Sequence, residues 1–261
     1  MIAKNIGIRR ARNPFVLCTN IDIVFSDGLC QYLASHRLQK GYAYRCNRCD
    51  VPQSFDENDS LAHILKWCES NILRRIGKNR WCAHSPMWGT FWYRNVCMMA
   101  ITSILTQVLI RPLTTKRLYT FYGLDTEACG DFTLMSKDDW LDIKGYIELD
   151  AYSLHIDSLA LSACVALGKR QVILPAAAHT YHISHQEGWH FNNIQDRILF
   201  DIKKPVIPWS TLKKAMLWML KHKRVVIENP KDWGYADEHF EEYSTCQSPV
   251  NKHKTQTLIN V

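Results

Sequence analysis

The sequence predicts an α/β fold, in which short buried strands alternate with helices. Residues 15–18 form a continuous apolar run bounded by polar residues, as in a strand buried on both faces. Residues 170–175 are rich in β-branched side chains and follow a helical pattern that ends at Gly168. Residues 209–223 place Leu212, Met216 and Leu220 on one side of an amphipathic helix. A hydrophobic content of 47% suits a folded core.

The composition also limits which partners the protein is expected to bind and in which cellular compartment it is expected. The net charge of +7 favours anionic partners such as nucleotide diphosphates or lipid headgroups. Nucleic acid ranks last, because the chain carries no recognised aromatic and basic motif. The ten cysteines lack regular spacing and the N-terminus lacks an apolar signal segment. We therefore expect a cytoplasmic protein with no nucleic-acid partner.

The first third of the chain predicts helices and strands in alternation. A basic helix end at residues 5–12 breaks at Asn13-Pro14 and leads into the strand at 15–18. Ser26 is placed to cap the next helix. The further elements expected here are a helix at 27–40, a strand at 42–51 and a helix at 60–76. Cys46 and Cys49 have the spacing of two zinc ligands, but no second pair follows, so we expect reduced thiols.

Residues 77–119 form a separate aromatic and apolar insertion. Residues 96–110 run for fifteen positions without a charge, which is shorter than the roughly 20 apolar residues that a spanning helix needs. An interfacial helix flanked by Arg94 and Arg111 is one interpretation. A buried or oligomer-forming helix is an equally good one. Either way we expect a helical insertion.

The second half repeats the strand and helix pattern. A strand at 132–135 leads into a helix that Ser136 is placed to cap and Gly145 to end. A further helix begins near Asp157, and a polar tail at 244–261 is expected to be disordered. Residues 1–243 then make up the folded domain.

Polar side chains follow the first strand at the point where it should end. Ligands in open α/β sheets bind outside the carboxyl ends of strands. The oxygens of Asn20 and Asp22 could there hold a hard divalent cation, Mg²⁺ or Mn²⁺, and through it a phosphate. The alternative is an Asx turn with no ligand.

These motifs resemble the family-two glycosyltransferases of the GT-A fold over about residues 1–50 and 120–240. The residues that carry the resemblance are Asn5, Gly7 and Ala11, then Asn20-Ile21-Asp22, then Tyr44, Arg45, Arg48 and Asp50, and finally Gly130-Asp131-Phe132, Asp157 and Tyr181-His182. The resemblance implies a GT-A-like mixed sheet flanked by helices. It begins at Met1 within the family pattern, so we expect an N-terminally truncated domain without the portion that holds the nucleobase.

The resemblance also implies roles for individual residues. Asn20 and Asp22 would bind the metal and the nucleotide-sugar, with His182 or, in its place, His185 as a further metal ligand. Sugar transfer also needs a base for the acceptor hydroxyl. Asp157 matches the last carboxylate of the family site, at a helix N-terminus that favours the ionised form, although simple capping would explain it equally well. His155 is the alternative base, and Asp131 is a weaker candidate that contacts the acceptor.

The expected function is therefore metal-assisted transfer of a sugar from a nucleotide-diphosphate sugar to a hydroxyl of a sugar, glycan or lipid-linked acceptor. The protein would be cytoplasmic, with a possible peripheral position on a membrane surface. The alternative is a degenerate, non-catalytic glycosyltransferase-like protein that acts in binding or as a scaffold. Asn20 stands where the family has an aspartate, and His155 where it has a carboxylate, and both substitutions favour this alternative.

Overall fold

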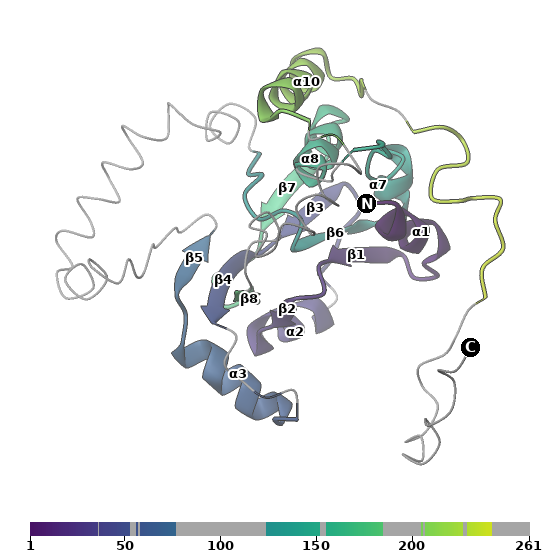
Figure 1. Ribbon diagram of the computed structural model, residues 1–261. Coiled ribbons are helices and arrows are strands. Elements are labelled where there is room, and N and C mark those ends of the chain that lie inside the picture. Colours follow the sequence, from purple (N-terminus) through teal and green to yellow (C-terminus); the bar gives the residue numbers. More distant parts are fainter. Residues whose placement is uncertain are drawn as a thin grey trace, which may run out of the picture.

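The computed structural model describes residues 1–35, 37–52, 56, 58–76, 124–151, 155–184, 205, 207–226 and 229–241. Within these residues the protein has six helices and eight strands arranged in two sheets (Figure 1). Both sheets are mixed, because each contains parallel and antiparallel pairs. The predicted α/β class with mixed sheets and flanking helices is confirmed.

The first sheet has the strand order β1-β6-β3-β7. Only the β3–β7 pair is parallel. The strands are β1 (Phe15–Thr19), β6 (Phe132–Ser136), β3 (Tyr42–Arg45) and β7 (Arg170–Ile173).

The second sheet has the order β2-β8-β4-β5, and its parallel pair is β4–β8. Its strands are β2 (Ile23–Phe25), β8 (His179–Ser184), β4 (Asn47–Pro52) and β5 (Arg74–Ile76). The chain passes from the first sheet to the second at residues 20–22, between β1 and β2, and again at Cys46, between β3 and β4. The ends of β1 and β3 and the starts of β2 and β4 therefore mark a seam between the sheets.

Helices cover both faces of the first sheet and one face of the second. Buried apolar side chains of α1, α7 and α8 form one core cluster with β1, β3 and β6, and α10 joins this cluster from outside α8 (Figure 1). Leu29 of α2 belongs to a cluster with Tyr44 and Phe132, and Cys68 of α3 packs with Tyr181 in the second sheet. The helices are α1 (Ile2–Arg10), α2 (Asp27–Ala34), α3 (Leu61–Ser70), α7 (Lys137–Asp142), α8 (Ile156–Ala166) and α10 (Trp209–His222).

Asn5 fixes α1 against the turn that follows α7. Its side chain is fully buried, donates to Tyr146 O at 2.7 Å and accepts from Tyr146 N at 2.8 Å. Gly145 has φ +68°, and a Cβ there would lie 2.4 Å from Asn5 Oδ1. Position 145 therefore needs glycine for two reasons: glycine tolerates the positive φ, and it has no Cβ to collide with the side-chain amide of Asn5.

Several predicted boundaries agree with the structure. β1 and β6 cover the expected strands, and α10 covers the expected amphipathic helix. Ser26 caps α2 by accepting from Leu29 N, and Ser136 caps α7 by accepting from Asp139 N. Gly145 and Gly168 follow their helices with positive φ. These local signals are sufficient because they act within one turn of chain.

Three predicted elements were wrong in extent. The helix expected at 27–40 ends at Ala34, and Leu38 reaches the same core cluster from an extended segment. The helix expected at 60–76 ends at Ser70 and is followed by β5, while Ile72 still packs with α3. The strand expected at 42–51 is two strands in different sheets. In each case an apolar side chain reaches the core without continuing the regular element, which periodicity alone does not reveal.

The aromatic insertion at 77–119 and the tail at 244–261 lie outside the described residues. No helix within the described ranges is both long and apolar enough to cross a membrane.

Candidate functional site

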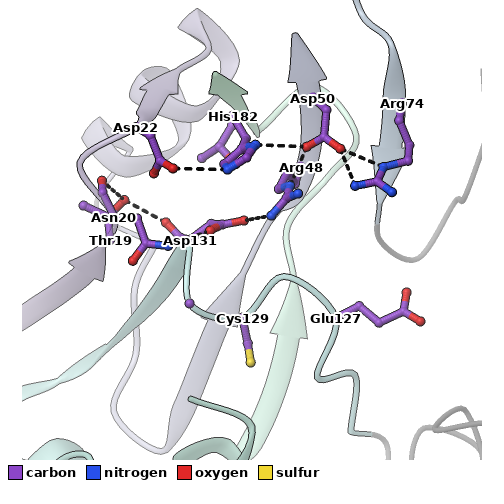
Figure 2. A network of polar contacts seen from close by, with 12 residues as sticks. Thr19, Asn20, Asp22, Arg48, Asp50, Arg74, Glu127, Cys129, Asp131 and His182 are labelled. Atoms are coloured by element: carbon purple, nitrogen blue, oxygen red, sulfur yellow. Dashed lines mark hydrogen bonds and ion pairs between the residues drawn. The ribbon is translucent and has the colours of Figure 1, made fainter. Parts of the chain in front are cut away.

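A continuous chain of polar contacts crosses the seam between the two sheets (Figure 2). His182 of β8 lies between two carboxylates. Its Nε2 is 3.2 Å from Asp22 Oδ2, and its Nδ1 is 3.3 Å from Asp50 Oδ1. The antiparallel pairing of Ile23 with His182 brings Asp22 to this place, although 160 positions separate Asp22 from His182.

Arg48 of β4 connects Asp50 to Asp131. Its Nε donates to Asp50 Oδ1 at 2.6 Å, and its Nη1 donates to Asp131 Oδ2 at 2.8 Å. Arg74 of β5 donates to the other oxygen of Asp50 at 2.7 Å. Burial raises the pKa of Asp50, but the hydrogen bonds from His182, Arg48 and Arg74 outweigh it and hold this pKa well below its usual range. Asp50 is therefore an ionised, buried carboxylate.

Asn20 continues the chain on the side of β1. Its Nδ2 donates to Asp131 Oδ1 at 2.8 Å, and its Oδ1 accepts from Lys4 Nζ at 2.8 Å. Lys4 also donates to Gly130 O at 3.0 Å. Thr19 Oγ1 donates to Asp131 O at 2.7 Å. The end of β1 is thus tied to α1 and to the segment that precedes β6.

Asp157 lies beside this chain of contacts, at the start of α8. One oxygen, Oδ1, accepts from Ser158 N of its own helix at 2.9 Å. The other oxygen faces Gly130: a Cβ at that glycine would lie 3.0 Å from Asp157 Oδ2 and 3.6 Å from Asn20 Nδ2. The absence of a side chain at position 130 therefore leaves room for the carboxylate and the amide on the same side of Gly130.

The buried Arg45 supports the segment that carries Gly130 and Asp131. It is 3% exposed, and its guanidinium donates to the backbone carbonyls of Asp125, at 3.0 Å, and Glu127. Arginine can bridge two carbonyls because its donors lie in a fixed planar fork. The residues of the site are thus held by the core of the first sheet.

The two thiols with zinc-ligand spacing belong to different core clusters. Cys46 belongs to the core cluster between α2 and the first sheet, and Cys49 to the cluster under α3. Burial raises the pKa of Cys46 to about 12 and that of Cys49 to about 11. Both are neutral thiols at pH 7, and neither forms a disulfide.

The structure brings most of the predicted site residues together. Asn20, Asp22, Asp131 and His182 belong to one network, and Asp157 lies next to it. His155 does not join it: its exposed ring contacts Trp209 of α10 at a centroid distance of 4.6 Å. His185 lies outside the described residues.

Two charged residues of the network, Lys4 and Arg74, were not anticipated, and Arg48 and Asp50 were named only among the residues that carry the resemblance, without a role in the site. Arg48 and Asp50 alternate on one face of β4, and this period-two pattern was the signal that could have found them. Arg74 carried no such signal, because it was expected to lie in a helix.

Asp22 and His182 supply one oxygen and one nitrogen donor for a metal ion, whereas the amide oxygen of Asn20 already accepts from Lys4 Nζ. No cluster of three or more histidine, cysteine, aspartate or glutamate side chains that could hold a metal ion occurs among the described residues. The metal site therefore stays a prediction, for which two donor side chains, Asp22 and His182, are in contact with each other.

No protein-family model matches this chain, and a search of characterised proteins finds no match.

Proposed function

We propose that this protein is a glycosyltransferase of GT-A type that transfers a sugar from a nucleotide-diphosphate sugar to a hydroxyl acceptor. The observation that carries the proposal is the contact of Asp22 with His182 at the seam between the sheets, 3.2 Å apart. The resemblance assigned these two residues to one metal site. They belong to different strands, and the pairing of β2 with β8 accounts for their meeting.

The donor set suits a divalent cation that accepts both oxygen and nitrogen ligands, such as Mn²⁺. Asp22 and His182, whose nearest side-chain atoms are 3.2 Å apart, would hold the ion. A cation bound there would offset the negative charge of the leaving diphosphate. The neighbouring Lys4 and Arg48 donate to Asn20, Asp50 and Asp131, and Asp50 in turn contacts His182.

Asp157 is the proposed base for the acceptor hydroxyl. Its Oδ2 faces Gly130 and Asn20, so the carboxylate lies beside the metal-side residues. This oxygen would accept the proton of the acceptor hydroxyl as the new glycosidic bond forms. The backbone N–H of Ser158 holds Oδ1 and thereby orients the carboxylate.

The runner-up is a non-catalytic binding protein, and a specific observation favours it. Asp50 and Asp131 are both bonded to Arg48, and Asn20 is bonded to Lys4, so the network has its charges balanced within the chain. A protein of this kind would bind a nucleotide without turning over a sugar donor. Binding and turnover must therefore be measured separately.

The test for binding is calorimetry with the full chain, Mn²⁺ and nucleoside diphosphates. We expect binding that requires Mn²⁺ and that Asp22→Ala and His182→Ala weaken at least tenfold. The matched controls are Asp138→Ala and His222→Ala, which change exposed residues outside the network. If the four variants behave alike, or if the wild type binds no nucleotide with Mn²⁺, the proposal is wrong.

The test for turnover is release of nucleoside diphosphate from a panel of nucleotide-sugars, with and without simple glycosides as acceptors. Asp157→Asn should lower this release at least 100-fold while leaving nucleotide affinity unchanged, because loss of a general base typically costs 10²–10⁴-fold. Nucleotide binding without release in the wild type would favour the non-catalytic reading.

A further inference from the structure

Helix α10 presents two different faces. Its inner face, which consists of Leu212, Met216, Met219 and Leu220, is buried in the core cluster that includes α8. On the outer face, Leu217 is 38% exposed and Trp218 is 43% exposed. The Trp218 ring lies against His222 with centroids 4.4 Å apart and an interplanar angle of 32°. Two large apolar side chains that are partly exposed on one helix are costly to leave in water.

The lysine and arginine residues of α10 and of the residues directly after it have no acidic residue among them. Between residues 209 and 226 the chain has five lysine and arginine residues and no acidic residue. Within the part of the chain that the structure describes, none of the five takes part in an ion pair. The basic residues are Lys213, Lys214, Lys221, Lys223 and Arg224.

We propose that the outer face of α10 binds an anionic lipid surface. An anionic bilayer attracts the lysines, and Trp218 with Leu217 can enter the headgroup region, where amphipathic rings are favoured. α10 lies outside α8, on the side of the molecule away from α2 and α3 (Figure 1).

Two other binding partners would fit the outer face of α10 less well. A second copy of the chain would bring two basic faces together, and like charges would repel. A nucleic acid would satisfy the lysines, but stable binding there needs aromatic rings spaced along a groove, and the outer face of α10 offers one indole. The lipid surface matches both the charge and the apolar pair.

The test is co-sedimentation with vesicles of phosphatidylcholine alone or with 30% phosphatidylserine added. The wild type should bind only the anionic vesicles, and binding should weaken with added salt. Each lysine near an anionic surface contributes about fivefold to binding. Lys221→Glu removes one positive charge and adds one negative charge, so it should reduce binding about 25-fold.

The matched controls lie on α3, which has an exposed lysine and an exposed leucine of its own. Lys66→Glu changes the net charge by the same amount as Lys221→Glu, and Leu61, 65% exposed, allows Leu61→Ser beside Trp218→Ser. The α10 variants should lose binding and the α3 variants should keep it, with thermal unfolding showing that all four fold.

The proposal is overturned if the wild type ignores anionic vesicles or if the α3 and α10 variants lose binding equally. It is also overturned if a short RNA binds more tightly than the vesicles and depends on Lys221 but not on Trp218, because the face would then be a nucleic-acid site.

Discussion

Replacing Arg48 tests whether the network at the seam holds the two sheets together. Arg48 of β4 reaches Asp50 on its own strand and Asp131 at the start of β6 in the first sheet. The carboxylates are almost completely buried, with side chains 8% and 6% exposed. Arg48→Met keeps the length of the side chain and removes its charge and donors.

The magnitude follows from the burial of the partners. Arg48→Met leaves Asp131 with the amide of Asn20 and leaves Asp50 with Arg74 and His182. Breaking a buried ion pair by removing one partner costs about 3–5 kcal/mol. Arg48→Lys keeps the charge but reaches only one carboxylate, so it should cost about 1.5–3 kcal/mol, the value of one charged hydrogen bond.

Urea unfolding at pH 7 measures these costs as changes in the free energy of unfolding. The matched control is Arg74→Met. Arg74 contacts the same Asp50, but its side chain is 51% exposed, so its loss should cost less than about 1 kcal/mol. If Arg48→Met costs no more than Arg74→Met, the claim that Arg48 secures the seam is refuted.

The contribution of Asp50 to the free energy of unfolding should decrease as the pH falls. The pKa of Asp50 is lower in the folded protein than in the unfolded chain, where an aspartate has a value of about 3.9. The contribution of Asp50 to stability is therefore fully present above pH 5 or so and is lost as the pH falls below about 4. The difference between wild type and Arg48→Met should shrink over the same range, and an increase toward acid would contradict this account.

The remaining predictions concern local structure, each measured by urea unfolding. Asn5→Ala should cost about 2–4 kcal/mol, because it leaves the buried Tyr146 N–H without its acceptor, whereas Asn58→Ala at an exposed site should change stability by less than about 0.5 kcal/mol. Gly145→Ala should cost at least about 2 kcal/mol, since its Cβ would lie 2.4 Å from Asn5 Oδ1 at φ +68°; a neutral result would contradict the close approach. Ser136→Ala should cost about 1–2 kcal/mol, because it removes the acceptor for Asp139 N at the start of α7, and an unchanged midpoint would show that the cap contributes nothing.

Some residues of the polar network could be named from the sequence because they follow recognisable elements. Asn20 and Asp22 come directly after a buried strand, and Asp157 opens a helix, so both are marked by local sequence. Arg48 was named only as part of the family pattern, and its bond to Asp131, 83 positions away, was not anticipated. No local pattern reports which carboxylate a strand residue will meet.

The sequence by itself determined the elements whose formation depends on nearby residues. The apolar run of β1, the serine caps of α2 and α7, and the glycines after α7 and α8 each act through contacts within a few residues. The physical reason is that hydrogen bonds at helix ends and the φ preference of glycine are local properties.

Only the tertiary structure decided the second sheet and the network at the seam. β2, β5 and β8 were not predicted as strands, and β2 and β5 have only three residues each. A short strand has too few side chains to show a period and too few hydrogen bonds to exist alone, so its partner determines whether it forms. β2 pairs with β8, and this pairing is what brings Asp22 to His182.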